Sequence, residues 1–178
     1  MPPPVAGQNV FLDDELGNFL IVGPGSDIIA GQKGADYMHG SQGGDFLLGN
    51  KGNDVVSGGQ GADFLYGGDG DDIVLGGQGN DLLSGDRGND LLIGGANNDT
   101  FEFNVLARVL NKGGWGVDVV GDFDPDRDVL SLRNGDVANV TMTDLGDDIA
   151  VFYNAIQIAV LKDVEDLPDE VADWFLVV

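Results

Sequence analysis

The chain has 178 residues, a length that suits one domain or one repeat array with a cap. Its 31 acidic residues against 8 basic ones give a net charge of −23, which argues against nucleic acid or an anionic membrane surface as a partner, because both attract basic proteins. The absence of cysteine excludes disulfides and thiolate metal sites.

Residues 1–21 form a lead-in without a cleavable secretory signal, because Met1 to Val5 has neither a basic segment nor an apolar core. No apolar run in the chain approaches the ~18 residues of a membrane span. Asn18 to Leu20 falls in phase with the repeat that follows, but Leu16 replaces the turn glycine. We therefore expect a degenerate first turn here.

Residues 22–102 form an array in which an aspartate recurs every nine residues. A small turn residue, glycine in all units but the last, lies two positions before it, and an apolar residue lies two positions after it. We number the aspartate as position six of the unit. The aspartates are Asp27, Asp36, Asp45, Asp54, Asp63, Asp72, Asp81, Asp90 and Asp99.

The composition of the unit predicts turn at positions one to six and strand at positions seven to nine. Small and polar residues fill the first six positions, where glycine allows backbone angles denied to other residues. Side chains alternate along a strand, so the invariably apolar position eight faces the core. Two units make one coil, and stacked coils form two parallel sheets around a thin interior.

Stacking places each aspartate beside its equivalent one coil later, as in Asp27 beside Asp45 and Asp81 beside Asp99. Two columns of carboxylates repel unless cations lie between them. Sites built only from oxygen, with turn carbonyls beside the carboxylates, favour Ca²⁺ over Mg²⁺, which keeps its waters. Zinc is disfavoured because cysteine is absent and His39 is the only histidine.

Residues 103–178 lose the period and are expected to form a cap of short strands. The strands are predicted at 119–120, 129–130, 140–142, 149–153 and 156–161, between Gly, Asn and Asp turns. A short helix is predicted from Leu167 to Phe175.

Residues 58–66 and 76–84 fit the nonapeptide G-G-x-G-x-D-x-U-x, where U is a large apolar residue. With this motif, the array resembles the RTX, or haemolysin-type, calcium-binding repeat family. The resemblance covers about residues 22–178. It implies an all-β, right-handed parallel β-roll with a C-terminal β-strand cap.

The resemblance also implies a ligand set for up to seven calcium ions. Carbonyls of positions two and four and the aspartate of one turn would share an ion with carbonyls of positions one and three and the aspartate of the equivalent turn one coil later. Val22, Pro24 and Asn97 depart from the pattern at the ends, and position two is Gln32, Ser41, Asn50 or Asp86 in some units. The carbonyl ligands so implied belong to Gly43, Gly49, Lys51, Gly52, Gly58, Gly59, Gln60, Gly61, Gly67, Gly68, Asp69, Gly70, Gly76, Gly77, Gln78, Gly79, Gly85 and Arg87.

The tail resembles RTX exoproteins as well. Residues 99–103 and 118–130 are similar to the segment that caps the roll, and residues 173–178 to the acidic-then-hydrophobic end of type I secretion substrates. The resemblance implies a bacterial protein exported to the outside by type I machinery. We expect the chain to fold only on binding calcium, because ordering a glycine-rich backbone is costly and the aligned carboxylates repel each other. A buried strand closing the cap is the alternative for residues 173–178.

No catalytic function is expected. The chain has no H-E-x-x-H zinc-protease motif and no lipase-type G-x-S-x-G, and His39 faces outward from a strand. An EF-hand from Asp122 is excluded because its sixth position is Arg127 and its twelfth is Arg133.

Position seven, although outward-facing, is apolar in both sheets, with Phe46 and Phe64 on one and Tyr37 and Ile73 on the other. Exposed apolar patches of this kind mark partner surfaces. Cover by the C-terminal strands or a fused domain is the preferred explanation. The alternative is a surface that binds polysaccharide or a second copy of the chain. Whether the chain is a complete exoprotein or the tail of a larger one stays open.

Overall fold

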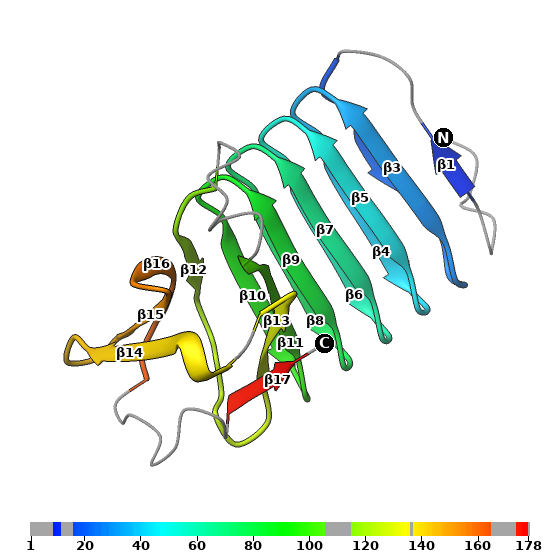
Figure 1. The fold of residues 1–178 in the computed structure, drawn as a ribbon. Coiled ribbons are helices and arrows are strands. Elements are labelled where there is room, and N and C mark those ends of the chain that lie inside the picture. Colours follow the sequence, from blue (N-terminus) through cyan, green and yellow to red (C-terminus); the bar gives the residue numbers. More distant parts are fainter. Residues whose placement is uncertain (1–8, 12–15, 106–114, 136, 165–173, 178) are drawn as a thin grey trace.

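The computed structural model describes residues 9–11, 16–105, 115–135, 137–164 and 174–177, and it is a stack of parallel coils with strands on two faces (Figure 1). This confirms the predicted all-β parallel β-roll. The first sheet has the order β1 (Asn9–Phe11), β3 (Ile28–Lys33), β5 (Phe46–Lys51), β7 (Phe64–Asp69), β9 (Leu82–Arg87), β11 (Thr100–Asn104), β13 (Val129–Arg133) and β17 (Phe175–Val177). The second has the order β14 (Val140–Asp144), β15 (Ile149–Tyr153), β16 (Ile156–Leu161), β12 (Asp118–Val120), β10 (Leu91–Ala96), β8 (Ile73–Gln78), β6 (Val55–Gln60), β4 (Tyr37–Gln42) and β2 (Phe19–Ile21).

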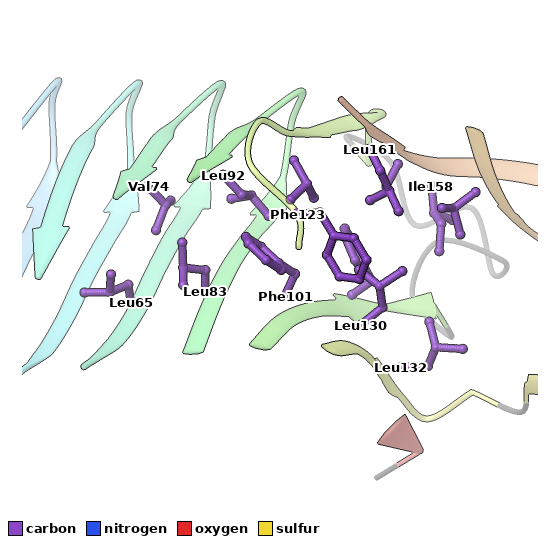
Figure 2. Close-up of a cluster of buried hydrophobic side chains, with 14 of the residues drawn as sticks. Leu65, Val74, Leu83, Leu92, Phe101, Phe123, Leu130, Leu132, Ile158 and Leu161 are labelled. Atoms are coloured by element: carbon purple, nitrogen blue, oxygen red, sulfur yellow. The ribbon is translucent and has the colours of Figure 1, made fainter. Parts of the chain in front are cut away.

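The core is a thin layer in which side chains come alternately from the two sheets, as Figure 2 shows from Leu65 to Phe101. Each strand of the array pairs in register with the equivalent strand one coil later, so Leu47 lies beside Leu65 and Val56 beside Val74. Each position-eight side chain is completely buried, as the alternation predicts. These side chains are Ile29, Met38, Leu47, Val56, Leu65, Val74, Leu83, Leu92 and Phe101.

The strands are longer than the three residues expected from the sequence. β7 runs from position seven, Phe64, through position three, Asp69, and the extra residues also pair in register, as Gly59 does with Gly77. The prediction of turn throughout positions one to six was therefore wrong for positions one to three. Position two does need a positive φ, 118° at Gly59 and 67° at Asp86, yet the parallel pairing continues across it.

The C-terminal region does more than cap the end of the roll, because its strands join both sheets. β12 pairs with β10 and β13 with β11, both in parallel, and β14 and β15 then add antiparallel pairs beyond β16. All five strands predicted after residue 103 are present. Phe123 and Trp174, with ring centroids 5.4 Å apart, close the core at this end.

The segment of the predicted helix is described only at its end. Residues 165–173 lie outside the described residues, and Phe175 begins strand β17, which pairs with β13. Within the described ranges, no helix has the length and hydropathy needed to cross a membrane.

The apolar residues at position seven remain on the surface. Phe46 is 36% exposed and Phe64 48% exposed on the first sheet, and Tyr37 and Ile73 are similarly exposed on the second. The described C-terminal strands therefore do not provide the cover that we preferred for these residues. They extend the two sheets edge to edge, which leaves the faces open.

Candidate metal centre

Each aspartate of the array from Asp45 to Asp99 is held at the boundary between two coils by one of its oxygens. The Oδ1 atom accepts a hydrogen bond from the main-chain amide of the equivalent aspartate one coil earlier, and the donor–acceptor distances are 2.7 to 2.9 Å. The structure thus brings together all seven aspartate pairs expected from stacking. They are Asp27–Asp45, Asp36–Asp54, Asp45–Asp63, Asp54–Asp72, Asp63–Asp81, Asp72–Asp90 and Asp81–Asp99.

The second oxygen of these carboxylates is the unusual feature. It is the Oδ2 atom, which is buried and has no hydrogen-bond partner in Asp45, Asp54, Asp63, Asp72, Asp81 and Asp99. The whole side chains are only 1% or 2% exposed. A buried carboxylate oxygen without a partner carries a large desolvation cost, so one repeated at every coil calls for a ligand.

The position-one glycines make room for this oxygen. A β-carbon added to Gly76 would collide with Oδ2 of Asp81 and with the carbonyl oxygen of Gly94, one coil later. A β-carbon at Gly49 would likewise collide with Oδ2 of Asp54 and the carbonyl oxygen of Gly67. The free carboxylate oxygen and a position-one carbonyl of the next coil therefore lie around the same glycine.

The position-three carbonyls differ from expectation. Position three was predicted to be turn, so its carbonyls were expected to lie outside the sheets. Instead, the carbonyl of Gln60 accepts the amide of Gly43 at 2.7 Å, and the carbonyl of Gln78 accepts the amide of Gly61 at 2.7 Å. Asp69 and Arg87 do the same for Gly52 and Gly70. The cause is the extension of the strands through position three. A carbonyl has two lone pairs, so each keeps one for a further contact.

A scan against protein-family models matches the RTX calcium-binding nonapeptide repeat in four copies, at residues 14–47, 39–74, 48–83 and 75–104. Together these copies span more than half of the chain. The chain belongs to the RTX calcium-binding repeat family. Calcium binding by this RTX chain is inferred from its membership of the family.

Two solved structures resemble the fold at low identity. The extracellular lipase LipA from Serratia marcescens has 20% identity and a TM-score of 0.42, and the match covers 93% of this chain but only 41% of the lipase. The AlgE6R3 subunit of the Azotobacter vinelandii mannuronan C5-epimerase has 23% identity and a TM-score of 0.35, with 99% and 86% covered. No curated protein sequence matches the chain.

The oxygen-rich boundaries of the RTX array suit a hard cation. Among the described residues, no group of three or more His, Asp or Glu side chains converges on one point. Each boundary instead offers two carboxylates together with main-chain carbonyls, which is the donor chemistry of calcium. His39 takes no part, because its Nδ1 lies 3.0 Å from Oγ of Ser57 on the outer face of the second sheet.

Without a cation, the columns resist ionisation. Burial raises the pKa of Asp72 and Asp81 to about 7, and the charges of neighbouring aspartates act in the same direction while the amide donors oppose it. Burial likewise raises the pKa of Asp45, Asp54 and Asp99 to about 6. A bound cation would reverse this shift, because opposite charge favours the carboxylate form.

The sequence analysis missed a further RTX turn beyond residue 102. Residues 113–121 read Gly-Gly-Trp-Gly-Val-Asp-Val-Val-Gly, which matches the nonapeptide with Asp118 at position six. The amide of Asp90 donates to Oδ1 of Asp118 at 3.4 Å, although the two residues are further apart in the sequence than the aspartate pairs of the array. The additional residues between them broke the period. The Asp-x-apolar spacing at Asp118 was the signal that could have revealed the turn.

Asp128 ends the other column in a different way. Its Oδ1 accepts the amide of Asp99 at 3.0 Å, which is the position-six contact of the array. Its Oδ2, however, accepts the amide of Asp124 at 2.9 Å. The carboxylate that closes this column therefore has main-chain donors on both oxygens.

At the other end of the array, Asn18 occupies the position of an aspartate. Its amide donates to Oδ1 of Asp36 at 2.7 Å, and β2 pairs with β4 in the register of the repeat. An amide side chain carries no charge, so the carboxylates of the column that runs through Asp36 and Asp54 begin at Asp36.

Proposed function

We propose that this chain is an RTX module whose aspartate columns bind calcium between successive coils, and that calcium drives its folding. The buried Oδ2 atoms without hydrogen-bond partners carry the proposal. For one ion, the ligands would come from Asp63, Gly59 and Gly61 of one turn and from Asp81, Gly76 and Gln78 of the equivalent turn one coil later. The same set repeats along both columns.

The energetics favour folding that depends on calcium over a fold that is already formed without it. The interior is one side chain thick, and ordering the backbone costs ~1–2 kcal/mol per residue, with glycine losing most. With a Kd of ~10⁻⁴–10⁻³ M and ~1 mM calcium, each site would contribute about 0.4–1.4 kcal/mol. Several such sites are comparable with the whole stability of a domain, so losing them would unfold the array.

A calcium titration followed by far-ultraviolet circular dichroism tests this proposal. The metal-free chain should lack the sheet spectrum and acquire it cooperatively as calcium is added, while magnesium at the same concentration should be much less effective. A complete sheet spectrum in excess chelator would contradict the proposal.

The same switch fits export by type I machinery to the outside of a bacterial cell. A highly acidic chain without cysteine, kept unfolded in a calcium-poor cytosol, would fold only after export. Phe175 to Val177 lie in β17 of the folded state, which is compatible with an exporter reading them before folding. Deleting residues 173–178 in a cell with such an exporter should abolish secretion, whereas retained secretion would exclude this signal.

A second candidate function uses the open sheet faces. Phe19 and Tyr37 stack on the second sheet with ring centroids 4.7 Å apart, and Phe46 lies 5.5 Å from Tyr66 on the first. Such aromatic rows would suit a polysaccharide or a second copy of the chain. Light scattering with calcium tests self-association, and a glycan array tests sugar binding. We propose no enzymatic activity.

A further inference from the structure

The two sheets of the roll differ in where they carry charge. Each first-sheet strand from β3 to β11 contains at least one charged residue, such as Lys51 in β5 and Glu102 in β11. The second-sheet strands β2, β4, β6, β8 and β10 contain no Asp, Glu, Lys or Arg. The strand ends show the contrast, because β5 ends in the exposed Lys51 and β6 in the exposed Gln60. An uncharged sheet face is unusual in a chain of which 22% is charged.

Large apolar side chains cover the outer face of the second sheet. Phe19 is 61% exposed, Ile73 39% and Tyr37 37%. The only polar side chains at positions seven and nine of β2 to β10 are Tyr37, His39 and Ser57, and Nδ1 of His39 lies 3.0 Å from Oγ of Ser57. A glycan needs several polar side chains for its hydroxyl groups, whereas a second apolar sheet needs none. This face therefore fits another sheet better than a sugar.

The area of this face is enough for a small specific interface. Strands rise about 3.3 Å per residue and lie about 4.8 Å apart, so the face from β2 to β12 measures roughly 20 Å by 24 Å. Two copies that meet through it would bury about 1,000 Å², which is at the lower end for a specific interface. The same contact through the first sheet would bury charged side chains such as Lys51, which is costly.

An aromatic pair and a groove lie at opposite ends of the face. Phe19 in β2 and Tyr37 in β4 stack with their ring centroids 4.7 Å apart. A groove of about 390 Å³ is bordered by Ile73, Leu91 and Val119, in β8, β10 and β12. The strand order is β12, β10, β8, β6, β4 and β2. A two-fold axis parallel to the strands, between β6 and β8, would place β4 of one copy over β10 of the other and β2 over β12. The aromatic pair of each copy would then meet the groove of the other.

We propose that the outer face of the second sheet joins two copies of this chain face to face, with Phe19 and Tyr37 of each copy in the groove of the other. Sheets packed in this way lie about 10 Å apart, with their strands within about 30° of each other. The phenol hydroxyl of Tyr37 can donate to the carboxylate of Asp71, which also borders the groove. The inference rests on the proposed function, whose second candidate it narrows to one partner, because the face forms only when the array folds on calcium.

Sedimentation equilibrium of the whole chain in calcium tests the dimer, and circular dichroism of the same samples reports whether the sheets are formed. Ile73→Lys places a charge near the centre of the proposed interface. Ile28→Lys is the matched control, because both isoleucines occupy position seven and are 39% and 38% exposed, but Ile28 lies on the first sheet. We expect the wild type and Ile28→Lys to be dimers. Ile73→Lys should dissociate about a hundredfold more readily, because like charges would meet in an apolar interface.

A folded wild type that sediments as a monomer would overturn the dimer and leave calcium-dependent folding intact, as would equal dissociation of the two variants. Glycan-array binding by that monomer, lost in Ile73→Lys, would assign the face to a sugar instead. A wild type without the sheet spectrum in calcium would refute the proposed function and the dimer with it.

Crosslinking tests the arrangement of the two copies, and it decides if Ile73→Lys does not fold. The chain has no cysteine, so His39→Cys and Ile93→Cys would each carry a single thiol. The two variants are mixed in calcium and treated with a short bifunctional maleimide. The proposed axis places His39 in β4 over Ile93 in β10 of the second copy, so crosslinks should join the two different variants. Crosslinks between identical variants alone, or none, would refute the arrangement.

Discussion

The array and its C-terminal end treat the same aspartate in two different ways. In the array, Oδ1 of Asp63 accepts a hydrogen bond from the amide of Asp45, and its Oδ2 is buried without a hydrogen-bond partner. In the terminal turn, both oxygens of Asp128 accept hydrogen bonds from main-chain amides. Under the proposed function, the array needs a cation for these carboxylates, whereas Asp128 has protein donors for both of its oxygens. The calcium dependence that we propose is therefore expected to arise in the array.

Removing calcium should have the largest effect. In chelator, amides of β5 to β8 should lose their protection from hydrogen exchange, because the buried carboxylates repel each other and each coil depends on its neighbours. Mass spectrometry of exchanged peptides measures this directly. Protection in β7 that is unchanged by chelator would show that the columns do not need the ion.

Acid should partly replace calcium. The raised pKa values, about 6 for Asp54 and about 7 for Asp72 against an ordinary 3.8, mean that the calcium-free fold binds protons that the unfolded chain releases. The stability of the calcium-free fold therefore rises as the pH falls through about 7 towards 4, and it is lost as the pH rises above 7. The metal-free chain at pH 5 should show more sheet by circular dichroism than at pH 8. Less sheet at pH 5 than at pH 8 would contradict the predicted pH dependence.

With calcium present, we expect the opposite pH dependence of stability. Protons compete with the ion for the same carboxylates, so the calcium affinity should fall as the pH falls through about 7. Calorimetric titrations at pH 8 and pH 6 compare the affinities.

Substitution of single aspartates tests the contrast itself. Asp63→Asn keeps the Oδ1 acceptor but removes the charge facing the ion, so the chain should lose most of its calcium-dependent stabilisation at that boundary. Asp128→Asn loses one hydrogen-bonded oxygen, which costs about 1–3 kcal/mol for an amide left without a partner. Its dependence on calcium concentration should stay that of the wild type. Urea midpoints across a calcium series separate the two variants, and equal slopes against calcium would remove the distinction.

The sequence predicted the parts of the molecule that repeat, because the burial of position eight and the seven aspartate pairs follow from a fixed period. The strands at 149–153 and 156–161 lie outside the repeat and were predicted from their local composition and the turn residues between them. Asp118 was missed because an insertion lengthens the sequence spacing to its partner, Asp90, beyond the two units of a regular coil. The sequence could not predict that the Asp122 carboxylate accepts the amides of Gly94 and Gly95, because this contact depends on where the chain passes after β12. The longer strands were missed because glycine was interpreted as turn, although these glycines also pair in register.

The position-one glycines should be more sensitive to substitution than the position-five glycine Gly44. In Gly58→Ala, the new β-carbon would collide with Oδ2 of Asp63, so calcium affinity and stability should both fall. Gly44→Ala is the matched control, because position five already carries alanine in Ala35 and Ala62. We expect overpacking at Gly58 to cost about 1–3 kcal/mol at saturating calcium, measured by urea unfolding. Equal losses in the two variants would mean that position one is not a cradle for the carboxylate.

The smallest effect is expected at Arg127, whose guanidinium pairs with Asp124 on the surface of the terminal turn. Exposed ion pairs are screened by water and salt, and they contribute little to stability. The turn is instead held by two hydrogen bonds, in which the main-chain amides of Asp99 and Asp124 donate to the carboxylate of Asp128. These contacts do not involve the arginine side chain. Arg127→Gln should therefore unfold at the wild-type urea concentration and bind the wild-type number of calcium ions. A clear loss of stability at low salt that disappears in high salt would show that the terminal turn depends on the charge of the Arg127 side chain.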